Sequence, residues 1–219
     1  ARAREQGIEF VELQTNAILI DEPYAAALAR AGLTSAFVSL LSHDPVAHDA
    51  ITLVSGSHER CVKGIENLAK FGIRVTLNPV IVRDTQHDFA DFVDFVATRL
   101  PPVESISVSA VQPHGRAGRA DGPKLLPDYA VLREVIPIAR ARARAHGIEL
   151  LNPYCGVPLC IGWKDDEAHS VEAIEARQGG WRPTPGLENR GDKVQGAPCE
   201  FCALRTRCGG AWRSPKSVN

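Results

Sequence analysis

Five cysteines gather in the last third of the chain, and their spacing is typical of metal or cluster ligands. Cys199, Cys202 and Cys208 form a C-x2-C-x5-C motif that two glycines follow directly. Cys155 and Cys160 lie upstream among prolines and glycines. Thiolates bind zinc and iron–sulfur clusters, and a C-x2-C pair brings two sulfurs to one metal from a tight turn. We therefore predict that this segment binds a metal ion or a cluster.

Three interpretations compete for these thiols: a zinc ion, a [4Fe–4S] cluster, and disulfides or free thiols. Zinc and the cluster each need four thiolates. Zinc ribbons pair one C-x2-C with a second C-x2-C, whereas this chain has C-x4-C and C-x2-C-x5-C, and the difference favours the cluster. The expected trio is Cys199, Cys202 and Cys208. The fourth ligand is Cys155 or Cys160, and we favour Cys160 because it follows a glycine-containing turn.

The linker from residue 163 to residue 195 contains Gly179, Gly180 and Thr184-Pro-Gly186, so we expect it to be mostly irregular. A loop-rich segment of this kind has little core of its own. We therefore expect the cluster to be what holds it in place.

The sixth cysteine belongs to a different pattern. Ser57 is a good N-cap for an amphipathic helix that runs to Phe71. Cys61, Ile65 and Leu68 repeat at i, i+4 and i+7 along it, which makes one buried stripe. Cys61 is therefore predicted to be a small core residue and not a ligand.

The rest of the chain alternates strands and helices with short connections, which predicts parallel βαβ units. We expect strands at 8–16, 35–41, 73–82, 103–111 and 148–151, and helices at 21–31, 45–51, 57–71, 89–96 and 128–146. Right-handed crossovers then give an open sheet or a barrel segment with the helices outside. Chemistry in such folds sits at the carboxyl ends of the strands. Polar residues stand at these ends: Thr15, Asn16, Ser39, Ser42, Thr76, Asn78 and Gln112.

The last long helix, 128–146, contains Pro137, which lacks an amide donor and is expected to kink it. Its three alternating arginines, Arg140, Arg142 and Arg144, are predicted to form a solvated face.

Composition limits the possible partners. The 219 residues carry a formal net charge of −1, which predicts neither a nucleic-acid nor an acidic-membrane partner. No apolar run approaches the ~20 residues of a membrane span. Six cysteines are too few for a disulfide scaffold, so we expect a reducing, cytoplasmic location.

The chain contains no methionine and begins with Ala1–Gly7, a sequence typical of the end of a helix, so we expect it to be the C-terminal part of a longer protein.

The order of several motifs resembles the core of radical S-adenosylmethionine (radical SAM) enzymes. The motifs are Thr15-Asn16, Phe37-Val-Ser-Leu40 with Asp44-Pro and His48-Asp49, Gly56-Ser57, Gly64 to Gly72, Val75-Thr-Leu-Asn-Pro-Val80, and Gln112 to Ala117. The closing C-x2-C-x5-C-Gly-Gly resembles the auxiliary-cluster extension, of the SPASM or shorter twitch type, in the peptide-modifying branch of that family.

This resemblance implies an α/β fold made of the C-terminal four βα units of a partial (βα)6 TIM-like barrel, plus a small irregular cysteine-rich extension that binds a cluster. The barrel part would span residues 1–147, and the extension residues 148–219. The family's C-x3-C-x2-C loop, which holds the cluster that cleaves the cofactor, would precede residue 1. The fragment alone is then expected to be inactive.

The resemblance also implies roles for four strand-end residues. Thr15 matches the family threonine near the methionyl group of the cofactor. Ser39 matches a fourth-strand serine that can donate to the cofactor's carboxylate or ribose. Thr76 occupies the fifth-strand position, where some members have a longer polar or basic residue. Gln112 stands where sixth-strand residues contact the adenine.

In full length, the resemblance implies reductive cleavage of S-adenosylmethionine at a [4Fe–4S] cluster to a 5′-deoxyadenosyl radical, which abstracts hydrogen from a substrate. One auxiliary [4Fe–4S] cluster would accept an electron or hold that substrate. The implied partners are a peptide or protein substrate and an external electron donor. Two alternatives remain: a zinc-stabilised α/β binding module, and a degenerate, non-catalytic homologue that carries a peptide.

Overall fold

A computed structural model describes residues 2–115, 117–118, 124–178 and 193–212. Its centre is a five-stranded, fully parallel sheet of strand order β1-β2-β3-β5-β7. The elements are α1 (Arg2–Glu5), β1 (Glu12–Thr15), α2 (Glu22–Arg30), β2 (Ser35–Val38), α3 (Pro45–Thr52), α4 (Ser57–Lys70), β3 (Arg74–Leu77), β4 (Val80–Ile81), α5 (Phe89–Arg99), β5 (Ser105–Ser107), β6 (Ser109–Ala110), α6 (Tyr129–His146), β7 (Glu149–Leu151), α7 (Val171–Arg177), β8 (Lys193–Val194) and β9 (Ala211–Trp212). Among the described residues, no helix combines the length and the apolar character that crossing a membrane requires.

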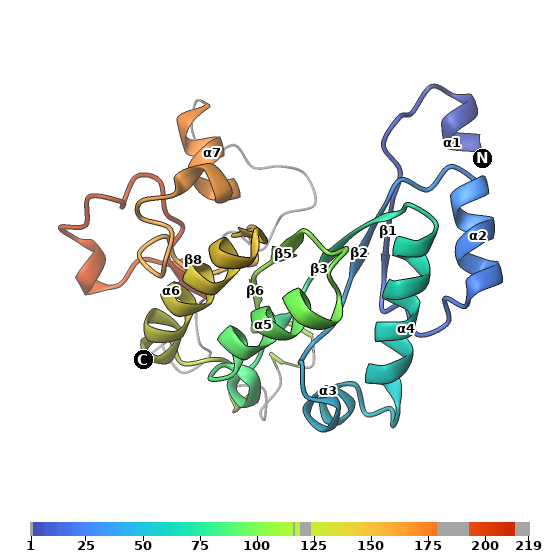
Figure 1. The fold of residues 1–219 in the computed structure, drawn as a ribbon. Helices are drawn as coiled ribbons and strands as arrows, with labels where there is room; N and C mark the ends of the chain where they lie inside the picture. The colour runs from blue at the N-terminus through green and yellow to red at the C-terminus, as the bar shows by residue number, and fades with distance from the viewer. Residues whose placement is uncertain (1, 116, 119–123, 179–192, 213–219) are drawn as a thin grey trace.

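One face of the sheet is packed against helices. Figure 1 shows α4, α5 and α6 along this side, with α4 against β3 and α6 against β7. Val38, Leu77 and Ile106 are paired neighbours across three strands, and none of them is exposed. Successive side chains of a strand point to opposite faces, so this apolar row fixes which residues face the helices. The parallel βα architecture predicted from the sequence is confirmed.

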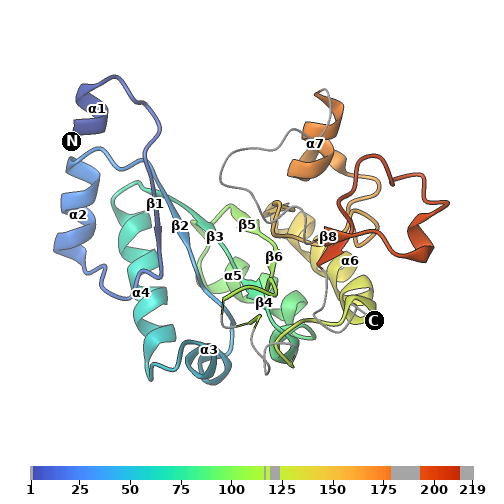
Figure 2. The ribbon, with the colours of Figure 1, turned by 180° about the vertical axis from the view of Figure 1, so that it is seen from behind.

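The opposite face, which we call the inner face, carries polar side chains. Figure 2 looks onto it, with the strands in front of the helices. Register pairs place one row of residues across the sheet: Gln14, Phe37, Thr76, Ser105 and Glu149. Each is partly or largely exposed, in contrast to the helix-facing row. The inner face therefore has polar groups that can meet a ligand.

Two predicted strands are each broken into two short ones. The segment expected at 73–82 divides into β3 and β4, and the one expected at 103–111 divides into β5 and β6. Asn78 and Pro79 separate β3 from β4, and Pro79 has no N–H to donate to a ladder. β4 and β6 then pair with each other in a separate two-stranded ladder. Both strands leave the main sheet together, and Asn78 and Ser109 lie at that point.

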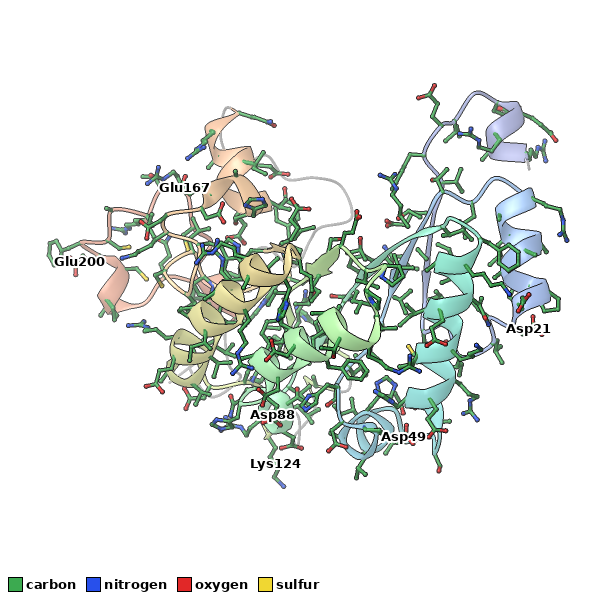
Figure 3. The ribbon with its side chains drawn as sticks, in the orientation of Figure 1. Asp21, Asp49, Asp88, Lys124, Glu167 and Glu200 are labelled. Carbon is green, nitrogen blue, oxygen red and sulfur yellow. The ribbon has the colours of Figure 1, made fainter. Side chains whose placement is uncertain are left out.

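The predicted N-cap of α4 is wrong: the cap lies one residue earlier than expected, and a different side chain accepts the hydrogen bonds of the first turn. Gly56 is the N-cap, and Ser57 is the first helical residue. The carboxylate of Asp49, within α3, accepts hydrogen bonds from the Gly56 N–H, the His58 N–H and the Ser57 hydroxyl. These bonds, led by the one from His58, lower the pKa of Asp49. Figure 3 labels Asp49 beside the start of α4. A side chain from the preceding helix thus does what the sequence assigned to Ser57.

The buried stripe of α4 is confirmed. Cys61 and Leu68 have no exposed surface, and Ile65 is 1% exposed. Burial raises the pKa of the Cys61 thiol to about 12, so the thiol is protonated and packed as a small apolar side chain.

The prediction that α6 exposes three arginines is wrong for Arg140. Its side chain is buried, pairs with Asp166 and lies 5.2 Å from the ring centroid of Trp163. Arg142 instead binds Asp91 of α5. Residues spaced two apart do not share one face of a helix, so the three arginines cannot all point to solvent together. Arg140 lies on the face that is covered by residues after β7.

The cysteine-rich segment is more ordered than expected. Residues 179–192, which include the predicted irregular glycines, lie outside the described residues, but α7 forms within the linker and β8 pairs with β9. Leu159, Trp163 and Ala173 are fully buried and belong to the same hydrophobic core as the sheet. β7 also joins the main sheet, past the expected boundary at residue 147. The segment therefore has packing contacts of its own, which the sequence did not predict.

The buried histidine of α3 makes the stability of the fold depend on pH. Burial, helped by neighbouring His58 and opposed by Asp49, lowers the pKa of His48 from 6.5 to about 4. Because the folded-state pKa is the lower one, the unfolded chain takes up this proton first as the pH falls. We expect the free energy of unfolding to fall by up to roughly 3 kcal/mol as the pH falls from 6.5 to 4. Urea unfolding at several pH values measures the slope.

The matched variant is His48→Asn, because an amide oxygen can accept the Leu41 N–H bond that His48 Nδ1 accepts at 3.2 Å. This variant should lose part of the slope, whereas His87→Gln, at an exposed position, should keep it. An unchanged slope in His48→Asn would show that other groups set the acid stability.

The burial of Cys61 predicts its reactivity. In the metal-free native protein, an alkylating reagent at pH 8 should leave Cys61 unmodified, since only the thiolate reacts and this thiol has a pKa of about 12. Cys160, which is exposed, provides the internal comparison. Mass spectrometry of the digested protein reads out each thiol. Modification of Cys61 at the rate of Cys160 would contradict the assignment.

Candidate functional site

The ends of β1 and β2 place two of the predicted cofactor contacts on opposite faces. Thr15 pairs with Val38, so it lies in the row that faces the helices. Its hydroxyl accepts the Ala17 N–H at 3.0 Å and shapes the turn after β1. The same turn packs on α4 at Gly64, where a Cβ atom would come within 2.1 Å of the Ala17 oxygen. Thr15 thus has a structural role in this turn.

Ser39 directly follows β2 and is two residues past Phe37, which lies on the inner face. Its N–H donates to the Thr15 oxygen at 3.0 Å, and its carbonyl lies 3.8 Å from the Cys61 sulfur. Within the described part of the chain its hydroxyl makes no hydrogen bond. The backbone of Ser39 is therefore held at both ends while its side chain remains available.

Thr76 lies on the inner face one strand away. Its hydroxyl forms a 2.8 Å hydrogen bond with the Ser105 hydroxyl across the β3–β5 pair. Gln112 follows β6, is partly buried, and begins the turn in which the His114 N–H donates to its carbonyl oxygen. Arg116, in the same predicted motif, lies outside the described residues. The fold thus brings Ser39 and Thr76 to one face and puts Gln112 at the carboxyl end of the sheet.

Cys155 is attached to the residues of β6. Its sulfur is 3.0 Å from the Ser109 hydroxyl, which also contacts the Asn78 side-chain oxygen at 2.6 Å. The Ala110 N–H donates to the Cys155 carbonyl, so the loop is attached to β6. This chain of three polar groups occupies the point where β3 and β5 leave the main sheet.

The loop that carries Cys155 is closed by a residue that the sequence analysis did not single out. Asn152 is 1% exposed, and its amide group both donates to and accepts from the backbone of Val157. Gly156 is needed inside this loop, since a Cβ atom there would come within 1.9 Å of the Asn152 side-chain oxygen. A polar residue at the end of a strand, followed by proline and glycine, was the available signal.

The C-terminal trio lies on a series of tight turns. The Cys202 N–H donates to the Cys199 oxygen at 3.2 Å, and the Arg205 N–H to the Cys202 oxygen at 3.0 Å. Peptide N–H groups also point at two of the sulfurs: Leu204 at Cys202 and Leu159 at Cys208, each at 3.4 Å. Such donors stabilise thiolates, the form that binds metals.

Cys160 is electrostatically linked to this trio. Partial burial raises the pKa of its thiol, Arg133 opposes that effect, and Cys202 and Cys199 raise the pKa further. Burial also raises the pKa of the Cys208 thiol, and the N–H groups that donate to its sulfur oppose this effect. Across the described residues, no three or more Cys, His, Asp or Glu side chains lie close enough together to hold a metal ion as they stand. The charge interactions of Cys160 with Cys199, Cys202 and Cys208 nevertheless place the four thiols near one another.

The end of the cysteine-rich segment, at Trp212, contacts α6 and the turn after β6. The Trp212 N–H donates to the Tyr129 hydroxyl of α6 at 3.2 Å. The ring of His114, two residues after Gln112, lies 6.2 Å from the Trp212 ring in an edge-to-face arrangement. The turn predicted to contact the adenine therefore touches the end of the cysteine segment.

Comparisons with known proteins agree with this architecture. Residues 1–96 match the Radical SAM superfamily. A stretch of 91 residues, 42% of this chain and 24% of the relative, is 31% identical to "AdoMet-dependent heme synthase" of Nitratidesulfovibrio vulgaris. The chain therefore spans about a quarter of the length of this curated relative.

Two solved proteins share the fold. Streptococcus suis SuiB bound to S-adenosylmethionine superposes with a TM-score of 0.58 at 15% identity, over 95% of this chain and 56% of SuiB. SuiB bound to its precursor peptide SuiA gives 0.50 at 17% identity, over 68% and 33%. A domain of pyruvate-formate lyase-activating enzyme from Bacteroides vulgatus gives 0.51 at 16% identity, over 69% of this chain and 84% of that domain. The sequence match over residues 1–96 and the fold shared with these two proteins agree with each other.

Proposed function

We propose that the protein containing this chain binds S-adenosylmethionine at the carboxyl ends of the β-strands and cleaves it at an iron–sulfur cluster. The observation that carries this proposal is the Radical SAM superfamily match, which covers β1, β2 and β3. It includes Ser39 and Thr76, the two predicted contacts that belong to the inner face. The same match and the enzymes that share the fold support an enzymatic function.

In this proposal, the residues of the chain bind and orient the cofactor. Ser39 has a free hydroxyl on a fixed backbone, so it can donate to the carboxylate or the ribose of S-adenosylmethionine. Thr76 is held by Ser105 and presents its oxygen as an acceptor. Gln112 contacts the adenine, and Thr15 supports the turn beside the methionyl group. When bound, the cofactor supplies a 5′-deoxyadenosyl radical, and precise orientation directs that radical to one substrate hydrogen.

We also propose that residues 148–219 hold one auxiliary [4Fe–4S] cluster, separate from the cofactor-binding region at 1–147. Its ligands are Cys199, Cys202 and Cys208 with Cys160 as the fourth, because Cys160 interacts with their charges whereas Cys155 contacts Ser109. The N–H donors to the sulfurs of Cys202 and Cys208 support thiolate ligation, and hydrogen bonds of this kind tune the potential of iron–sulfur clusters.

A peptide or protein side chain is the proposed substrate, together with an external electron donor. SuiB, which shares the fold, has been solved with its precursor peptide. The 31% identity to a heme synthase supports a second candidate, a tetrapyrrole substrate. Product analysis after incubation with each class, under the same reducing conditions, separates the two.

The test of the main proposal uses protein expressed from its complete gene and reconstituted with iron and sulfide without oxygen. It should convert S-adenosylmethionine to methionine and 5′-deoxyadenosine when a reductant is added. Ser39→Ala should weaken cofactor binding roughly tenfold, because a hydrogen bond to a charged group is lost. Calorimetry or equilibrium dialysis measures the affinity.

Ser55→Ala, at an exposed serine, is the control and should bind normally. Equal affinity in both variants would remove Ser39 from the site. Cluster-loaded protein that binds the cofactor and forms no 5′-deoxyadenosine would favour the non-catalytic homologue.

The auxiliary cluster is tested in the chain of residues 1–219. Cys202→Ser should lose most of the iron and sulfide that the reconstituted parent chain holds, because a ligand is removed. Cys61→Ser is the matched control and should keep both, since its sulfur is in the core. Iron analysis and visible absorption give the result. One tightly bound zinc without a visible band would instead establish the zinc module.

A further inference from the structure

Behind the cysteine loop lies a buried ion pair that connects three elements. Lys193 of β8 donates to the carboxylate of Glu172 of α7, and the two side chains are 2% and 3% exposed. The Lys193 ammonium also lies 5.0 Å from the ring centroid of Trp212 of β9. Removing two charges from water costs several kcal/mol per ion unless each finds partners, so a pair this deeply buried depends on all of its contacts.

The second oxygen of Glu172 reaches the cysteine loop itself. It accepts the Gly209 N–H at 2.9 Å, directly after Cys208. The carboxylate therefore fixes the peptide next to a predicted ligand.

The next residue is fixed from the opposite side. Gly210 has φ +90°, and a Cβ atom there would come within 2.1 Å of the Val194 oxygen. Val194 follows Lys193 in β8, so the strand that supplies the ammonium also packs against the loop. The Gln195 side chain, one residue on, donates to the Cys208 carbonyl at 2.6 Å. Cys208 thus lies in a loop held by Glu172 on one side and by β8 on the other.

We propose that Glu172 and Lys193 are positioning residues that hold Cys208 in place for the auxiliary cluster and set the reduction potential of that cluster through their opposite charges. The proposal rests on the auxiliary cluster proposed above. The carboxylate fixes the Gly209 peptide, and the ammonium offsets the negative charge that the carboxylate would otherwise impose on the cluster. Neither residue binds iron.

Removing either charge of this ion pair should shift the reduction potential of the cluster, and the two shifts should have opposite signs. In the reconstituted chain 1–219, Glu172→Gln keeps an acceptor for the Gly209 N–H but removes a negative charge, so the reduction potential should rise. Lys193→Met removes the positive charge and leaves the carboxylate, so the potential should fall. A redox titration followed by electron paramagnetic resonance measures both shifts. A role limited to stability would not give two shifts of opposite sign.

Glu200→Gln is the matched control, because Glu200 stands next to Cys199 in the sequence but is exposed to water, as its position at the outer tip of the segment in Figure 3 shows. Water screens its charge, so the same substitution should shift the potential less. The double variant Glu172→Gln/Lys193→Met removes both buried charges, should fold, and should have a potential between those of the single variants.

A second measurement needs no cluster. In metal-free protein, Glu172→Leu removes the acceptor for Gly209, and amide hydrogen exchange of residues 208–212 should become faster, with exchange in β2 and β3 unchanged. Unchanged exchange, or potentials that move in the same direction or stay fixed, would overturn the proposal while leaving the cluster intact. A parent chain that takes up no iron would overturn the auxiliary cluster itself.

Discussion

The alternation of side chains along the parallel strands is the constraint on which the rest of the structure depends. Val38, Leu77 and Ile106 must face the helices, since this row excludes water from the core. Each residue one step along its strand then faces the other way, which places Phe37 and Thr76 on the inner face. A shift of one residue in register would exchange the two faces. Core packing thus decides which polar groups are available for chemistry.

The cysteine segment depends on a second kind of interaction. Apolar burial holds its first part, where Leu159 and Trp163 join the core of the sheet. Its last part is held by charges and polar groups: Glu172 on Gly209, and Tyr129 on Trp212. Buried polar contacts are directional, so they fix a loop more specifically than apolar packing does. These contacts within the chain therefore help to position the segment.

Periodic patterns in the sequence predicted the helices and strands well, because a buried stripe such as Cys61, Ile65 and Leu68 depends only on residues within one helix. The parallel order of the strands followed from the alternation of elements. Contacts between segments far apart in the sequence were not predictable in the same way. Arg140 is buried because Asp166 and Trp163 cover it, and neither partner is marked by spacing. The cap that Asp49 provides for α4 likewise depends on the angle between two helices.

The difference between local patterns and long-range contacts also explains which features of the candidate sites could be predicted from the sequence. The short motif C-x2-C-x5-C carries its own geometry, since tight turns follow from the spacing. The different surroundings of Cys155 and Cys160 could not be predicted from spacing, because both stand in one glycine- and proline-rich loop. Asn152 closes that loop around Val157, which turns Cys155 towards Ser109 at the ends of the β-strands and leaves Cys160 beside Arg133 and the other thiols. One buried amide thus shapes the loop that carries both thiols.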